Sequence, residues 1–232
     1  MTTLEVLAFD ADDTLWQNER FFRLTETAFA DLLSDYADPA HLTERLLETE
    51  RRNLARYGFG IKGFTLSMIE TALEITEGKA PASVIQTILD KGHEMLEHPV
   101  ELLPHVAETI QSLKGDFRLM VITKGDLFDQ ERKIALSGLA DHFDGIEIVS
   151  DKNPETYRNV FSRHGVTAEN AMMVGNSLKS DVLPVLDLGG WGVHVPHSQT
   201  WVFEHADPPQ SHPRFREIDH LGGLQGVLKS LG

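Results

Sequence analysis

The sequence from residue 4 to residue 14 reads LEVLAFDADDT. Its first six residues are mostly apolar and lack strict polar alternation, as is typical of a parallel strand covered on both faces. This apolar run leads directly into Asp10, and two further carboxylates follow at Asp12 and Asp13. We therefore expect a buried strand that ends in an acidic loop.

Further apolar runs of the same kind occur along the chain, at residues 117–122, 145–149, 171–174 and 191–195. Helical patterns lie between them, at residues 104–114, 153–164 and 177–188. Each of these helical patterns is followed by a glycine, a common signal for the end of a helix. Strands that alternate with helices indicate right-handed βαβ units. The predicted fold class is therefore α/β, with a Rossmann-like, doubly wound parallel sheet.

The segment from residue 17 to residue 98 has no convincing strand, and its apolar side chains recur at helical spacing. We predict an inserted helical domain of roughly four helices there, with the sheet-containing core formed by residues 1–16 and 99–232. Inside the insert, the glycine-rich stretch 58–64 is expected to form a loop. The tail at 195–220, rich in proline and histidine, is expected to wrap the sheet edge as irregular chain.

The composition excludes several classes of protein. Of the 232 residues, 41% are hydrophobic and 25% charged, as in ordinary soluble globular proteins. No apolar run approaches the ~20 residues of a membrane span, and we expect no secretory signal. The lack of cysteine excludes disulfides and thiolate sites and suits a cytoplasmic location. A formal net charge of -15 argues against nucleic acids and anionic membranes as partners.

Polar residues capable of chemistry follow the predicted strands. They are Asp10, Asp12, Thr123, Lys152, Asn176 and, one helical turn further on, Asp181. The carboxyl ends of parallel strands share one edge of a sheet, so these distant residues should converge. Clustered carboxylates repel one another, and a bound Mg²⁺ would offset that cost through oxygen ligands. The pattern predicts attack of a carboxylate on phosphorus, with a second group protonating the leaving oxygen.

The same residues resemble a known family. Asp10-x-Asp12-x-Thr14, Thr123, Lys152 and Gly175-Asn176-Ser177-x-x-x-Asp181 are similar, in order and spacing, to the four motifs of the haloacid dehalogenase-like hydrolases. The helical insert after the first motif resembles the C1-type cap of that superfamily. The resemblance covers essentially the whole chain, and it implies a phosphatase that acts on a small phosphorylated metabolite.

The resemblance also implies a role for each motif residue. Asp10 would be the nucleophile and a metal ligand. Asp12 would be the general acid and base, and its backbone carbonyl would also bind Mg²⁺. Thr123 and Lys152 would bind the phosphoryl group during transfer. In C1-capped relatives a cap loop helps to choose the substrate, which makes Lys62 a candidate substrate-binding residue; an exposed, solvated lysine is the alternative.

Asn176 and Asp181 would complete the metal shell. Many relatives carry aspartate where this chain has Asn176. An amide oxygen still binds a metal, but the site loses one negative charge, so we expect weaker Mg²⁺ binding than in an aspartate-bearing relative.

Other activities stay open on the same scaffold. They are a phosphomutase, a phosphonate hydrolase that uses a cap lysine such as Lys62, and a non-catalytic binding module in which Asn176 marks a decayed site. The dehalogenases of the superfamily lack an acid at the position of Asp12, which disfavours that reading. The particular substrate, the oligomeric state and the role of the tail at 194–220 do not follow from the sequence.

Overall fold

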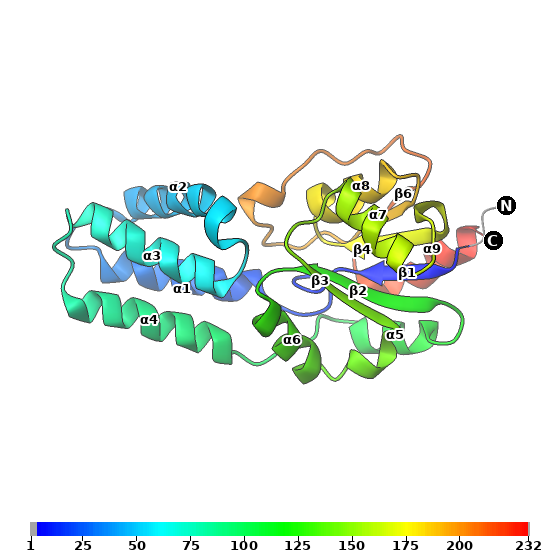
Figure 1. Cartoon of the computed structure of the whole chain (residues 1–232), viewed down its shortest axis with the longest axis horizontal. Helices are drawn as coiled ribbons and strands as arrows, with labels where there is room; N and C mark the ends of the chain where they lie inside the picture. Colours follow the sequence, from blue (N-terminus) through cyan, green and yellow to red (C-terminus); the bar gives the residue numbers. More distant parts are fainter. Residues whose placement is uncertain (1–3, 232) are drawn as a thin grey trace. The chain divides into compact units, whose positions relative to one another are not determined.

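The computed structural model describes residues 4–231 of the chain. The chain divides into two compact units (Figure 1): one is Met1–Glu19 with Val100–Gly232, and the other is Arg20–Pro99. We call them the core and the helical unit. The sequence placed the divisions after residues 16 and 98, and the two units part after Glu19 and Pro99.

The core is built on a six-stranded sheet in which every neighbouring pair is parallel. Its strands are β1 (Val6–Phe9), β2 (Arg118–Lys124), β3 (Gly145–Val149), β4 (Ala171–Gly175), β5 (Trp191–His194) and β6 (Phe215–Glu217). The spatial order is β3-β2-β1-β4-β5-β6, so β1 lies inside the sheet between β2 and β4. This topology confirms the predicted Rossmann-like α/β fold.

Helices cover both faces of the sheet, as Figure 1 shows. Leu7 and Phe9 of β1 belong to the apolar cluster that includes α5 (Val106–Leu113), α6 (Leu127–Leu136) and α9 (Leu224–Leu231). Val6 and Ala8 belong to the opposite cluster, with α7 (Pro154–Arg163) and α8 (Leu183–Leu186). Because successive side chains of a strand point to opposite faces, the apolar run of β1 supplies both clusters.

The helical unit has an apolar core of its own, formed by residues such as Phe29, Leu42, Met68 and Ile88. Its helices are α1 (Glu19–Leu32), α2 (Pro39–Tyr57), α3 (Ile61–Ile75) and α4 (Ala82–Glu97). Shorter turns occur in the core: η1 (Ala140–His142), η2 (Ala168–Asn170), η3 (Leu178–Val182), η4 (Val202–Glu204) and η5 (Leu221–Gly223). No helix within residues 4–231 is long and apolar enough to span a lipid bilayer.

The loop in the glycine-rich stretch 58–64 is shorter than the sequence indicated, because only residues 58–60 lie between two helices. Gly58 and Gly60 have φ angles of 69° and 120°, which favour glycine, and they separate α2 from α3. Helix α3 already begins at Ile61, so Lys62 lies in its first turn rather than in a loop. Gly63 is helical, and a Cβ there would lie 3.1 Å from the carbonyl oxygen of Gly58. This glycine therefore serves close packing.

The tail was predicted to wrap the sheet edge as irregular chain, and that expectation was wrong for two short ordered elements. Within it, Phe215–Glu217 forms β6 and pairs with Gly192, Val193 and His194 of β5. The strand has only three residues, two of them charged, so it lacks the apolar run that marks the other strands. The turn η4 is a second ordered element of the tail.

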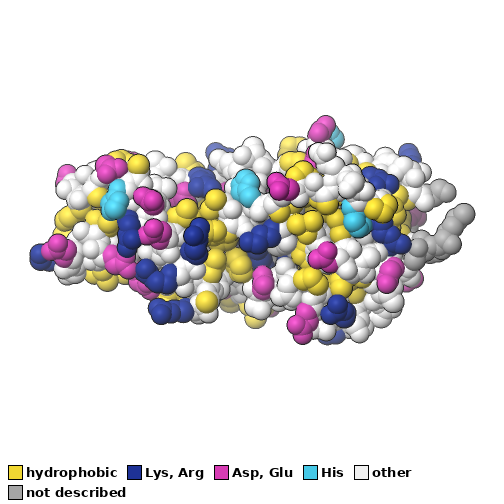
Figure 2. Space-filling view, turned by 90° about the horizontal axis from the view of Figure 1, so that it is seen from above, with side chains coloured by type: hydrophobic (Ala, Val, Ile, Leu, Met, Phe, Trp, Pro, Cys, Tyr) yellow, Lys and Arg dark blue, Asp and Glu magenta, His cyan; other side chains and the backbone are white. Residues whose placement is uncertain are grey.

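Acidic and basic side chains are interspersed on the face of the molecule that Figure 2 shows. The basic side chains seen there do not form a continuous stripe of the kind that nucleic-acid-binding proteins use to track a phosphate backbone.

Candidate active site

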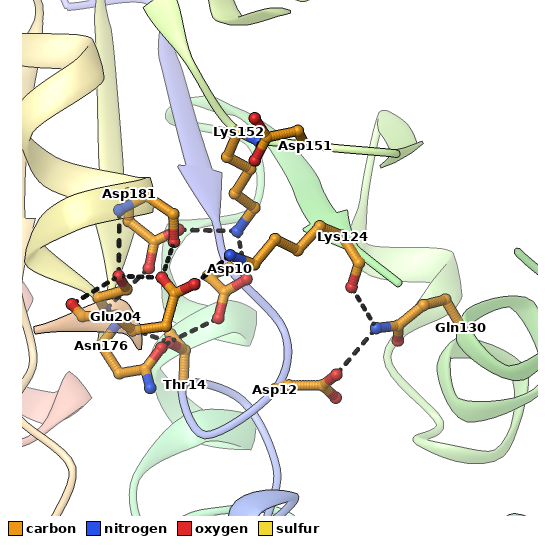
Figure 3. Close-up of polar contacts among 12 residues, drawn as sticks. Asp10, Asp12, Thr14, Lys124, Gln130, Asp151, Lys152, Asn176, Asp181 and Glu204 are labelled. Atoms are coloured by element: carbon orange, nitrogen blue, oxygen red, sulfur yellow. Dashed lines mark hydrogen bonds and ion pairs between the residues drawn. The ribbon is translucent and has the colours of Figure 1, made fainter. Parts of the chain in front are cut away.

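A buried lysine lies between two buried carboxylates at the carboxyl edge of the sheet (Figure 3). The Lys152 Nζ contacts Asp10 Oδ1 and lies 2.7 Å from Asp181 Oδ1. Burial raises the pKa of Asp10 to about 7; the Lys152 ammonium opposes this rise and the Asp181 carboxylate adds to it. Burial alone would lower the pKa of Lys152, but the two carboxylates raise it above its usual range. The lysine therefore stays charged.

The strands place these groups. The Asp10 amide donates to the Val174 carbonyl at 2.9 Å, which continues the pairing of β1 with β4 by one residue. Lys152 follows β3 and precedes α7, whose amino end is capped by the Asn153 side chain on the Thr156 amide at 3.0 Å. Asp10 and Lys152 are 142 positions apart, and they meet because β1 and β3, with β2 between them, end at the same edge of the sheet.

Asp181 reaches the site because Gly175 has no side chain. A Cβ on Gly175 would lie 2.2 Å from Asp181 Oδ2, a distance that no real contact allows. The same Oδ2 accepts the Ser177 amide at 2.9 Å, and the Tyr157 hydroxyl donates to the Ser180 carbonyl at 2.9 Å. The turn η3, which contains Asp181, is therefore fixed against β4 and α7.

Thr14 joins the acidic loop to the end of β4. Its Oγ1 lies 3.2 Å from Asp10 Oδ2 and 3.3 Å from Asn176 Oδ1, and it accepts a hydrogen bond from the main-chain amide of Asn176 at 3.0 Å. The side-chain oxygens of Asp10 and Asn176 are consequently neighbours of one hydroxyl. Thr14 braces the two segments against each other.

The donor chemistry of this cluster fits Mg²⁺. Two carboxylates and an amide oxygen, from Asp10, Asp181 and Asn176, meet at one edge of the sheet, and Mg²⁺ prefers hard oxygen ligands. Within the described residues, no group of three or more His, Cys, Asp or Glu side chains could hold a metal ion. A cation here would therefore depend on the Asn176 amide and on main-chain or water oxygens besides the two carboxylates.

Asp12 lies in the same loop, but its carboxylate points away from Asp10 and toward α6 (Figure 3). The Lys133 Nζ contacts both carboxylate oxygens, at 2.7 and 2.9 Å, and Gln130 Nε2 donates at 2.8 Å. The Trp16 indole also donates, at 2.8 Å. The sequence missed Gln130 and Lys133. Asp126 caps α6 through the main-chain amides of Phe128 and Asp129, which marks the start of the helix but not its contacts with Asp12.

Thr123 lies near the end of β2, the strand next to β1. It is buried, and its Oγ1 has no hydrogen-bond partner among the described residues. A buried hydroxyl without a partner costs free energy that a bound oxygen would recover. Lys62 belongs to the helical unit, and its role in substrate binding stays a prediction.

Glu204 of the turn η4 is a part of the site that the sequence did not reveal. Its Oε1 contacts the Lys124 Nζ, and its Oε2 lies 2.5 Å from both the Ser177 and the Ser180 hydroxyls. Burial would raise the pKa of Glu204, but Lys124 and the two serines hold it below its usual value. Its partners lie up to 80 positions away in the chain, so no local pattern marks this residue.

The family model of the haloacid dehalogenase-like hydrolases matches residues 4–188, which span both units and all the motif residues. The chain belongs to the haloacid dehalogenase-like hydrolase family. The predicted family is therefore confirmed, and with it the class of enzyme, a hydrolase.

Known proteins extend this likeness. The chain is 44% identical to a haloacid dehalogenase-like family hydrolase from Xanthomonas campestris, whose crystal structure superposes with a TM-score of 0.89 over 99% of this chain and 92% of that one. It is 26% identical to a glyceraldehyde 3-phosphate phosphatase of Methanothermobacter thermautotrophicus over 80% of this chain and 83% of the relative. A glyceraldehyde 3-phosphate phosphatase of Methanocaldococcus jannaschii is 22% identical over 79% and 81%.

Proposed function

We propose that this protein is a Mg²⁺-dependent phosphatase that hydrolyses a small phosphomonoester through an aspartyl-phosphate on Asp10. The observation that carries the proposal is the contact of the buried Asp10 carboxylate with the Lys152 ammonium, which also contacts Asp181. The side-chain oxygens of these carboxylates and of Asn176 are of the kind that bind Mg²⁺. A permanent cation at this point would bind the phosphoryl oxygens of a substrate and offset the charge of an acidic protein.

In the first step, a carboxylate oxygen of Asp10 attacks phosphorus, and the bond between phosphorus and the ester oxygen breaks. Asp12 gives its proton to the departing oxygen, which leaves as an alcohol. In the second step, water attacks the phosphorus of the aspartyl-phosphate while Asp12 takes up a proton, and inorganic phosphate leaves with the carboxylate restored. Lys152 and the Thr123 hydroxyl hold the phosphoryl oxygens throughout.

Mg²⁺, when bound, would stabilise the negative charge on those oxygens. Asp10, Asn176, Asp181 and the backbone carbonyl of Asp12 would hold it. We also propose that the helical unit acts as a C1-type cap and that its Lys62 helps to select the substrate. The proposed location of the protein is cytoplasmic.

The substrate that we propose is a small phosphorylated sugar or a related metabolite. The two curated relatives are named for hydrolysis of glyceraldehyde 3-phosphate, at 22% and 26% identity. A panel should therefore contain three-carbon phosphates, hexose phosphates, nucleotides and phosphoglycolate, with release of inorganic phosphate as the measurement.

The decisive experiment compares the wild type with Asp10→Asn. Loss of a nucleophile typically lowers kcat by ~10⁴-fold or more, so turnover should vanish. The variant retains the ion pair between Lys152 and Asp181, so circular dichroism should show an unchanged fold. Activity should also require Mg²⁺ and stop with chelator. Full activity in Asp10→Asn, or in a metal-free solution, contradicts the proposal.

A further inference from the structure

The Glu204 carboxylate connects the tail to two separate parts of the site. One oxygen contacts Lys124, the last residue of β2 and the neighbour of Thr123. The other oxygen lies 2.5 Å from the hydroxyls of Ser177 and Ser180 in the chain after β4. The side chain is only 14% exposed, so these contacts are largely shielded from water.

The two serines belong to the segment that presents the expected metal ligands. Ser177 follows Asn176, and Ser180 precedes Asp181. The Ser177 hydroxyl also accepts the Ser180 amide at 3.0 Å, and so caps η3. An ionised carboxylate only accepts hydrogen bonds, and those it receives from hydroxyls are among the stronger ones in proteins. Glu204 therefore fixes both ends of the short segment between Asn176 and Asp181.

The turn that carries Glu204 is itself anchored to η3. The Lys179 Nζ donates to the Phe203 carbonyl at 2.9 Å. The Trp201 and Phe203 rings pack edge to face, with centroids 4.7 Å apart. Lys124 supplies the countercharge that keeps the partly buried Glu204 carboxylate ionised. The contact is thus a built arrangement rather than a single surface ion pair.

We propose that Glu204 is a positioning residue for the reaction: it holds the turn from Ser177 to Asp181 so that Asn176 and Asp181 face Asp10. This inference rests on the proposed function, because it assigns Glu204 an effect on Mg²⁺ binding. Groups that orient metal ligands typically change metal affinity or activity by about 10–100-fold when they are removed.

The experiment measures Mg²⁺ affinity by calorimetry on the whole protein, with Glu204→Ala and Glu147→Ala as a matched pair. Glu147 is a partly buried carboxylate of β3. It contacts Arg163 at 2.5 Å and His164 at 2.8 Å, and these two residues lie at the carboxyl end of α7, whereas Lys152 precedes its amino end. We expect Glu204→Ala to raise the Mg²⁺ Kd by about 10–100-fold and Glu147→Ala to leave it unchanged.

A second readout follows the turn itself. Hydrogen exchange of the peptide from residue 176 to residue 182 should accelerate in Glu204→Ala and stay unchanged in Glu147→Ala. Glu204→Gln keeps an oxygen that accepts from the serines, and it should recover most of the Mg²⁺ affinity. If Glu204→Ala does not fold, Ser180→Ala removes one of the two hydroxyl contacts and should raise the Kd to a smaller extent.

The possible outcomes separate the two claims. A wild type that binds no Mg²⁺ and hydrolyses no phosphomonoester contradicts the proposed function. A wild type that binds Mg²⁺, with an unchanged Kd in Glu204→Ala and Ser180→Ala, overturns the positioning role alone. An equal rise in the Kd for Glu147→Ala also overturns it, because the effect would then be general destabilisation.

Discussion

Lys133 holds both carboxylate oxygens of Asp12, at 2.7 and 2.9 Å from its Nζ. Gln130, one helical turn earlier in α6, donates to the same carboxylate at 2.8 Å. The residue proposed as the general acid is therefore restrained by a helix that follows β2. To protonate a leaving group, the Asp12 carboxylate must leave these partners or share them with the substrate.

The first prediction concerns the leaving group. Asp12→Asn should lower kcat/KM, which reports the step in which the leaving group departs, by about 10²–10⁴-fold for an alkyl phosphate, because the alkoxide needs a proton to depart. The loss should be much smaller for para-nitrophenyl phosphate, whose leaving group is stable without one. Lys133→Met should show the same preference more weakly, and Lys133→Arg should restore activity. Equal losses on both substrates would show that neither residue serves proton transfer.

The second prediction separates activity from stability at Thr123. Its buried hydroxyl has no partner among the described residues, so Thr123→Val should leave the melting temperature unchanged or raise it slightly. A hydrogen bond to a charged group contributes about 1.5–3 kcal/mol, so kcat/KM should fall by roughly 10–150-fold. Thermal unfolding and steady-state kinetics on the same samples test this. A large stability loss without a change in kinetics would assign Thr123 a structural role.

The third prediction concerns the stability of the site. Lys152→Met leaves the Asp10 and Asp181 carboxylates buried without their countercharge, and unfolding free energy should fall by about 3–5 kcal/mol. Lys79→Met removes an exposed ion pair with Glu77 and should cost no more than about 1 kcal/mol. Urea titration of both variants gives the comparison. Similar midpoints for the two would mean that the buried cluster adds little to stability.

The fourth prediction tests the departure at Asn176. Replacing its amide by a carboxylate adds a negative charge next to Asp10, and ligand charge is a main determinant of affinity for hard cations. Asn176→Asp should therefore bind Mg²⁺ more tightly, by roughly 10-fold. Gln225→Glu adds the same charge to the exposed surface of α9 and serves as the control. Unchanged affinity in Asn176→Asp would place the ion away from this side chain.

The sequence predicted the parts of the structure that depend on regular patterns. The run before Asp10 marked β1, because a strand buried on both faces must be apolar throughout. The proximity of Lys152 to Asp10 and Asp181 followed from the rule that parallel strands end at one edge. The family that these motifs resembled is the family to which the chain belongs.

What the sequence did not show depends on side-chain contacts between distant segments. Lys133 is an ordinary helical lysine until α6 packs beside the acidic loop. Glu204 lies in a tail without periodicity, and its partners become neighbours only after the sheet has formed. The sequence around such residues carries no signal, because their role depends on a contact with a distant segment and not on a periodic pattern in the chain.

Lys152 also has a consequence for how the protein matures. Since this lysine already neutralises part of the charge of Asp10 and Asp181, we expect the chain to fold without a divalent ion. The protein can then fold first and bind its ion afterwards. Its activity would depend on the concentration of the cation, whereas folding itself would not. A chelator should accordingly stop turnover while the chain stays folded, and the melting temperature should fall only by the contribution of ion binding to the native state.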